Sequence, residues 1–175
     1  MVKTSTDLNK KTKKTDLRKT VIVGLGNPIL TDDSDGINIA RKLKGFFGNE
    51  SSVDVLEVYA GGIRLIDVLE GYERAVIIDA IVTGKEMPGT IFRLSLSDLP
   101  STRNTLSVHD MDLPTALELG KTLGLCLPHD ITIWAIEAGD VETFSENLTE
   151  DVEKAVPFVV ENILKDFNSD LRGRQ

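Results

Sequence analysis

The sequence predicts an α/β fold: a three-layer α/β/α sandwich around a mainly parallel twisted sheet, with one antiparallel edge strand. After residue 19, short apolar segments typical of buried strands alternate with segments of helical periodicity, in the order βαβαββαβα. Several of the strand candidates are almost continuously apolar, as in strands that are covered on both faces. The chain of 175 residues is long enough to form one domain with its own core.

The first predicted βαβ unit begins with the apolar run 20–25, which ends in Gly-Asn-Pro turn chemistry. Ser34 or Asp35 is expected to cap a helix that extends to about Phe47, because apolar residues recur there at helical spacing. Residues 53–58 then alternate between apolar and polar side chains, which predicts the second strand.

In the middle of the chain, the Gly61-Gly62 pair is expected to open a short helix that closes near Gly71. Residues 74–78 form an apolar run that stops at Asp79, which suits a central strand. Residues 90–95 follow a Pro-Gly turn and alternate in polarity, which places this strand at an edge of the sheet.

The last third of the chain completes the pattern. Asp110 or Asp112 is expected to cap a helix that extends to about Leu123. Residues 131–136 predict the last strand, with a core tryptophan inside it. Residues 149–166 predict the last helix, whose acidic first turn complements the helix dipole.

Charge and cysteine content limit the partners of the folded part. Residues 1–19 hold seven Lys/Arg and two Asp, which is expected of a disordered basic leader, whereas the remainder carries a net charge of −13. We expect one domain over 20–167, a tail over 168–175, no binding of nucleic acid and a monomeric state. No apolar run approaches the ~20 residues that span a bilayer, so no membrane contact is expected. The single cysteine, Cys126, suits a reducing cytoplasm.

Three residues are expected at the edge formed by the carboxyl ends of the parallel strands. Asp33 follows the turn after the first strand, Asp79 closes the third strand, and His109 precedes a helix that begins near the same edge. Two carboxylates and one imidazole are the donors of a small metal site. Each also has a structural explanation: Asp33 as a helix cap, Asp79 as a partner of loop amides, and His109 as a packed histidine.

Other motifs are weaker indications of function. The glycine turn lacks the third glycine of a dinucleotide fingerprint, where Ile29 stands instead. Ser107 and His109 form a pair without an orienting third group or an oxyanion site, so they do not predict a serine protease. Cys126 lies in an apolar stretch and is expected to be a buried, inert thiol. His129 is expected in a surface loop.

Two enzyme families carry a turn of this kind. The Gly-Leu-Gly-Asn-Pro segment at 24–28 resembles the opening of peptidyl-tRNA hydrolases, but that family continues with glycine and soon supplies a catalytic histidine. Here Ile29 follows, and no histidine occurs before His109. We keep this hypothesis as an alternative.

A fuller resemblance covers approximately residues 21–166. The segment 24–33 matches Gly-x-Gly-Asn-x-Leu-x-x-Asp-Asp/Glu, Asp79-Ala80 is followed by a Pro-Gly-Thr turn at 88–90, and Ser-x-His stands at 107–109. In these three motifs and their order, the chain resembles the endopeptidases that mature the large subunit of [NiFe] hydrogenases. Some relatives have Glu where Asp33 stands, which alters the reach of the side chain and leaves the donor type unchanged.

The resemblance implies an endopeptidase that removes a C-terminal extension from the nickel-loaded large-subunit precursor. Asp33, Asp79 and His109 would be both the metal ligands and the catalytic residues of an aspartyl-type site. They would recognise nickel held by the substrate, or bind another divalent metal in the free enzyme. A non-catalytic nickel-sensing maturation chaperone with the same three residues remains the second alternative.

Overall fold

Five strands form a single mixed sheet in the order β2-β1-β3-β5-β4. The computed structural model describes residues 18–48, 50–59, 63–99 and 113–172. All neighbouring strands are parallel except β4 and β5, which pair antiparallel, as predicted for the edge strand. The strands are β1 (Arg18–Leu25), β2 (Val53–Val58), β3 (Tyr72–Ile81), β4 (Ile91–Ser95) and β5 (Asp130–Glu137).

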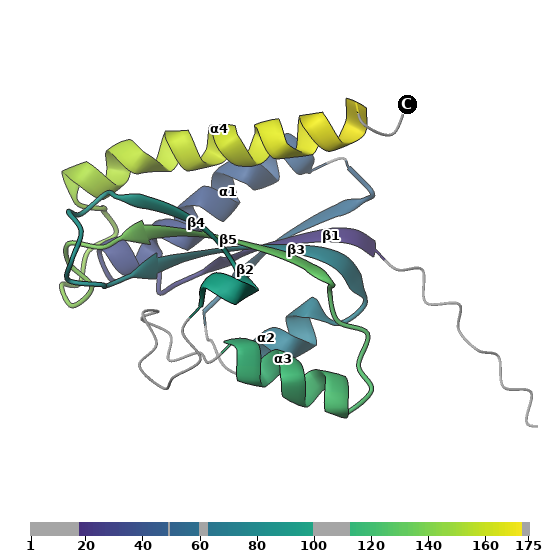
Figure 1. The fold of residues 1–175 in the computed structure, drawn as a ribbon. Coiled ribbons are helices and arrows are strands. Elements are labelled where there is room, and N and C mark those ends of the chain that lie inside the picture. The colour runs from purple at the N-terminus through teal and green to yellow at the C-terminus, as the bar shows by residue number, and fades with distance from the viewer. Residues whose placement is uncertain (1–17, 49, 60–62, 100–112, 173–175) are drawn as a thin grey trace, which may run out of the picture.

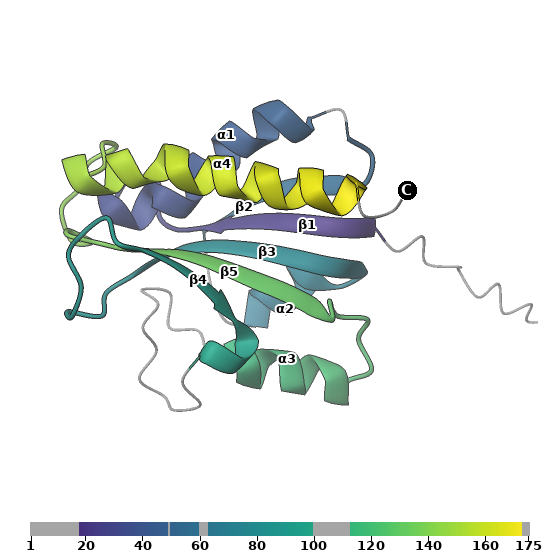
Figure 2. The ribbon, with the colours of Figure 1, turned by 45° about the horizontal axis from the view of Figure 1, so that its top comes forward.

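Helices cover both faces of this sheet, which confirms the predicted three layers (Figure 1). Figure 2 shows α1 and α4 together on one face and α2 and α3 on the other. No helix among the described residues is long and apolar enough to cross a membrane. The helices are α1 (Asp35–Phe47), α2 (Ile63–Leu69), α3 (Leu113–Thr122) and α4 (Glu150–Arg172), with short 3-10 turns η1 (Asp32–Ser34) and η2 (Leu96–Asp98).

The central strands bury side chains on both faces, as their apolar sequences predict. In β3, Val76 and Ile78 pack toward α1 and α4, whereas Ala75 and Ile77 pack toward α2 and α3. Trp134 of β5 is also buried, in the core under α1 and α4. Because β1, β2, β3 and β5 are parallel, their carboxyl ends meet at one edge of the sheet, where α1 and α4 begin.

Several boundaries differ from the predicted ones. Strand β1 begins at Arg18, so the last two residues assigned to the leader belong to the sheet. Strand β3 continues past Asp79 to Ile81, because it stays paired with β5 over those residues. The Asp79 carboxylate interrupts the run of apolar residues, but the backbone pairing of β3 with β5 continues past it.

Helix α4 ends at Arg172, so the predicted tail from residue 168 is wrong for its first five residues. Phe167 supplies the physical reason. Its ring packs against Phe47 with 4.9 Å between centroids, and the guanidinium of Arg74 lies 5.2 Å from its centre. This contact with α1 and β3 stabilises the last turns of α4, and no local pattern in the sequence indicates it.

Candidate functional site

The turn after β1 places Asp33 at the carboxyl edge of the sheet. Gly26 has φ +145°, and a side chain there would collide with the carbonyl oxygen of Asp33, so this turn favours glycine. The Asn27 N–H donates to Asp33 Oδ2 at 3.1 Å. The Asp33 side chain is therefore held by its own turn, and the residue is only 2% exposed.

Asp79 lies at the same edge, inside the last part of β3. Ile78, the residue before it, pairs with Gly24 of β1, and Asp79 itself pairs with Ala135 of β5. Asp79 is 5% exposed. Two of the three predicted site residues are thus buried at the edge where the adjacent parallel strands β1 and β3 end. The third, His109, lies outside the described residues.

Asp35 is a further carboxyl group in this region, and the sequence predicts it only as a possible helix cap. It is fully buried, and neither carboxylate oxygen has a hydrogen-bond partner in the described part of the chain. Burial holds the pKa of Asp35 well above its usual range. The nearby charges of Asp79, Asp32 and Asp33 raise this pKa further, whereas the Gly36 amide lowers it. The carboxyl groups of the site are therefore close enough to influence one another.

Glycine contacts explain why Asp35 is buried. A side chain at Gly36 would collide with the carbonyl oxygens of Leu25 in β1 and Ile78 in β3. The first turn of α1 therefore lies directly on two strands, where a longer residue than glycine would force it away. This close approach removes Asp35 from solvent and brings it into the electrostatic range of Asp79.

Asp32, the neighbour of Asp33, has a structural role. Its Oδ2 accepts hydrogen bonds from Gly139 N (2.8 Å), Asp140 N (2.9 Å) and Thr149 Oγ1 (2.9 Å), and its Oδ1 accepts one from Thr149 N (2.8 Å). Asp32 thereby links the turn after β1 to the end of β5 and the start of α4. The sequence gives no sign of this role, since all the partners lie more than 100 residues away.

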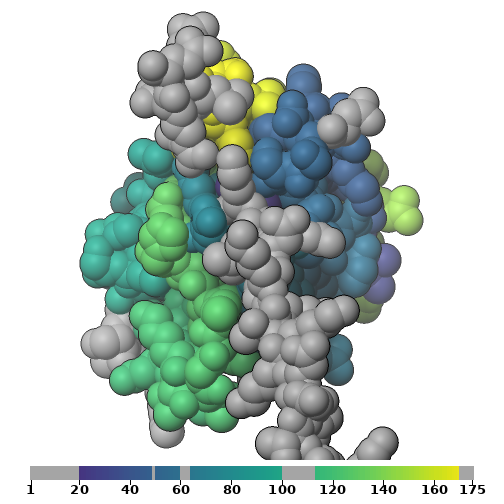
Figure 3. Space-filling view, turned by 90° about the vertical axis from the view of Figure 1, so that its right-hand side faces the viewer, coloured from purple at the N-terminus to yellow at the C-terminus, as the bar shows by residue number. Residues whose placement is uncertain are grey.

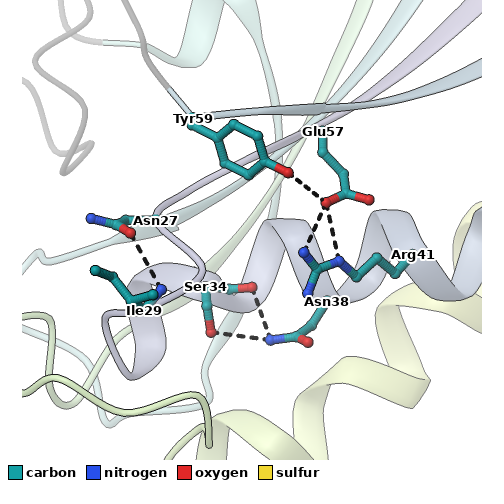
Figure 4. A network of polar contacts seen from close by, with 7 residues as sticks. All are labelled: Asn27, Ile29, Ser34, Asn38, Arg41, Glu57 and Tyr59. Carbon is teal, nitrogen blue, oxygen red and sulfur yellow. Dashed lines mark hydrogen bonds and ion pairs between the residues drawn. The ribbon is translucent and has the colours of Figure 1, made fainter.

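Polar contacts also brace the start of α1 (Figure 4). The Asn38 amide donates to the carbonyl and the hydroxyl oxygen of Ser34, both at 3.0 Å. The Ser34 hydroxyl donates to Thr31 O at 2.7 Å, so Ser34 stands at the N-cap without capping the helix through its side chain. One turn further on, Arg41 pairs with Glu57 of β2 at 3.0 Å, which ties α1 to the end of that strand.

Within the described ranges, no three His, Cys, Asp or Glu side chains are arranged to hold a metal ion. Two buried carboxylates are nevertheless suitable ligands for a divalent metal, and an imidazole would complete the donor set. The third predicted donor, His109, lies outside the described residues.

Cys126 and His129 lie away from this edge. Both belong to the connection between α3 and β5, on the opposite edge of the sheet, and that segment is part of the green region in Figure 3. His129 is exposed, as predicted. Cys126 is exposed as well, so the prediction of a buried thiol is wrong. The apolar residues around it belong to a turn. In this turn, the carbonyl oxygen of Cys126 accepts a hydrogen bond from the Gly71 N–H.

The burial of Asp35 predicts a pH dependence of stability. Because the pKa of Asp35 is raised on folding, the folded chain binds this proton more tightly than the unfolded chain does. Stability should therefore decline as pH rises above the ordinary carboxyl range, with a slope of up to about 1.4 kcal/mol per pH unit, until Asp35 ionises. Urea unfolding from pH 4 to 8 should show a shallower decline for Asp35→Asn, and parallel curves would contradict this account.

Comparison with known proteins is consistent with this geometry. A family model described as hydrogenase maturation protease matches residues 37–166, a range that includes Asp79 and His109 and begins just after Asp33. The hydrogenase 2 maturation protease of Escherichia coli (strain K12) is 27% identical over 145 residues, which cover 82% of this chain and 87% of that protein.

Solved structures show the same fold. The hydrogenase maturating endopeptidase HybD from E. coli aligns with a TM-score of 0.74 and 25% identity, over 87% of this chain and 93% of that one. The [NiFe] hydrogenase maturation protease HybD from Thermococcus kodakarensis aligns with a TM-score of 0.65 and 28% identity, over 84% and 97%. These similarities support neither a peptidyl-tRNA hydrolase nor a non-catalytic nickel-sensing protein. The chain belongs to the hydrogenase maturation protease family, a family of peptidases.

Proposed function

We propose that this chain is the endopeptidase that removes a C-terminal extension from the nickel-loaded large-subunit precursor of a [NiFe] hydrogenase. The observation that carries the proposal is the burial of Asp33, in the turn after β1, and of Asp79, in the last part of the adjacent parallel strand β3, in a chain of this family. In such sheets, ligands bind beyond the carboxyl ends of the strands. The scissile segment of the precursor would lie across this edge.

Asp33, Asp79 and His109 would together recognise nickel that the precursor already holds. Carboxylate oxygen and imidazole nitrogen are suitable donors for such an ion. The low exposure of Asp33 and Asp79 strengthens the attraction, because charges interact more strongly where water is excluded. Recognition of nickel and cleavage would then be functions of one site, so that a precursor without nickel is spared. Another divalent metal would find the same donors in the free enzyme.

Incubation of the wild-type chain with purified nickel-loaded precursor tests the proposal. A peptidase shortens the precursor, and mass spectrometry should find both the trimmed large subunit and the released C-terminal peptide. A non-catalytic nickel-binding module would bind the precursor and leave its mass unchanged. An intact precursor after prolonged incubation would therefore contradict the proposed function.

The proposed chemistry uses no thiolate, so Cys126→Ser should leave the rate of cleavage within about twofold of wild type. Cys126 is exposed, so its substitution should have little effect on stability. Substitutions on the surface, away from special features, usually alter stability by less than ~0.5 kcal/mol. The measurement is the initial rate on nickel-loaded precursor. Loss of activity in a folded Cys126→Ser variant would indicate a cysteine nucleophile.

The surroundings of the reaction follow from charge and cysteine content. The folded part carries a net charge of −13, which disfavours nucleic acid as a partner. A single, exposed cysteine suits a reducing compartment, and we place the reaction in the cytoplasm. The chain would act as a monomer on a protein substrate.

A further inference from the structure

Large apolar side chains are exposed at the edge of the sheet that carries the carboxylates. Ile29 follows β1, Val82 and Met87 follow β3, and Phe144 follows β5; they are 50%, 46%, 77% and 77% exposed. We call these four side chains the rim patch. Exposed apolar groups gathered near one edge are typical of an interaction site, whereas single scattered ones need no explanation.

Two of these side chains belong to connections that run side by side. The turn after β1 pairs with the β5–α4 connection through an antiparallel bridge between Leu30 and Phe144. The Ser145 N–H donates to Ile29 O at 3.0 Å, and the Thr31 N–H donates to Thr143 O at 3.1 Å. Ile29 and Phe144 are therefore parts of one continuous backbone structure.

The β3–β4 connection, which carries Val82 and Met87, joins the same structure. Pro88 lies against Gly139, where a side chain would come within 3.2 Å of the proline ring. The Gly89 N–H donates to Glu137 O at 2.8 Å. Figures 1 and 2 both show this connection beside the β5–α4 connection at one end of the sheet.

Buried carboxylates hold these connections in place. Glu137 accepts hydrogen bonds from Thr83 N (2.9 Å), Thr83 Oγ1 (2.7 Å) and Gly84 N (3.0 Å), directly after Val82. Asp32 holds the start of the β5–α4 connection in the same way. The Ile29 N–H also donates to the side chain of Asn27 (Figure 4). The rim patch is thus held in a fixed backbone frame, which lowers the entropic cost of binding.

The rim patch and the candidate site belong to the same parts of the chain, the β1–α1 connection and the end of β3. Ile29 stands four residues before Asp33, and Val82 stands three residues after Asp79. A protein whose scissile segment reaches those carboxylates would bring its neighbouring surface near the patch. The charged side chains exposed on these connections are mainly acidic, with Glu86, Glu142 and Glu146 against one Lys85.

We propose that the rim patch docks an apolar surface of the folded large-subunit precursor beside its scissile segment, and that basic residues border this surface. The inference rests on the proposed function and deepens it, since it assigns part of substrate recognition to side chains outside the metal site. Aromatic residues and Met are enriched in protein interfaces, and a few such anchors often supply most of the affinity. Phe144 and Met87, the two most exposed members, are the expected anchors.

Single substitutions test this docking surface. Phe144→Ser and Met87→Ser should each weaken binding of nickel-loaded precursor by about tenfold, measured as Kd by surface plasmon resonance and as KM for cleavage, with kcat unchanged. Leu123→Ser and Phe158→Ser are matched controls, because these side chains are also well exposed but lie elsewhere. Leu123 is 65% exposed and follows α3 at the opposite edge of the sheet, and Phe158 is 55% exposed and lies on α4. Both controls should bind like wild type.

The outcomes separate this inference from the proposed function. If wild type cuts the precursor and the rim variants bind it like the controls, the docking surface is wrong and the proposed function stands. If wild type leaves the precursor intact, the proposed function fails, and the Kd values alone decide whether the patch binds it. A wild-type dimer that Phe144→Ser converts to a monomer would show that a second copy covers the patch and would overturn the inference.

Discussion

Replacing His109 by alanine is expected to slow cleavage of nickel-loaded precursor by about a hundredfold or more, a typical loss when one group that stabilises a reacting centre is removed. The reason is chemical: the carboxylates of Asp33 and Asp79 would lose the only nitrogen donor that the proposed site has. In the sequence, His109 stands outside the apolar runs that predict the core strands, so the melting temperature should change little. Initial rates and thermal unfolding measure the two effects separately.

The chain supplies its own control, because it contains only two histidines. His129 is exposed and lies in the connection between α3 and β5, on the opposite edge of the sheet. His129→Ala should cleave the precursor at the wild-type rate. Normal activity in the His109 variant would remove its role as a ligand, and equal losses in both variants would indicate a non-specific effect.

Asp32→Ala is expected to cause the largest loss of stability, about 3–5 kcal/mol. Hydrogen bonds to a charged group contribute ~1.5–3 kcal/mol each, and removing the carboxylate leaves several buried donors without a partner. The four contributions do not add, since they share one side chain. Because small domains have ~5–15 kcal/mol in total, this variant should unfold at much lower urea concentration.

Asp140→Ala is the matched control for Asp32. Its carboxylate accepts the N–H groups of Glu142 and Thr143 in the same connection, at 3.0 and 2.9 Å, but it is not buried. Its removal should be much less destabilising, because water replaces the lost acceptor. A similar urea midpoint for both variants would show that Asp32 does not link the turn after β1 to α4.

Much of the fold follows from local sequence. The apolar runs at 20–25, 74–78 and 131–136 predict β1, β3 and β5, and the alternation at 53–58 and 90–95 predicts β2 and the edge strand β4. The two largest departures arise from distant contacts. Strand β3 passes Asp79 because β5 continues to pair with it, and α4 passes residue 166 because Phe167 packs on Phe47.

The candidate site was only partly predictable. Asp33 and Asp79 were predicted at the carboxyl edge, since parallel strands end together there. Asp35 was predicted only as a possible helix cap, because its burial depends on Gly36 lying against two strands. Asp32 had no predicted role, because its hydrogen bonds come from residues more than 100 positions away. Cys126 was misplaced because an apolar neighbourhood in sequence need not be a buried one in space.

The rate of cleavage on nickel-loaded and nickel-free precursor, measured side by side with wild-type enzyme, tests the central claim most directly. If Asp33, Asp79 and His109 recognise nickel held by the substrate, the loaded precursor should be trimmed and the nickel-free precursor should remain intact. Adding nickel to the depleted precursor should restore its cleavage. Equal trimming of both precursors would leave a peptidase but would contradict recognition of the metal by these three residues.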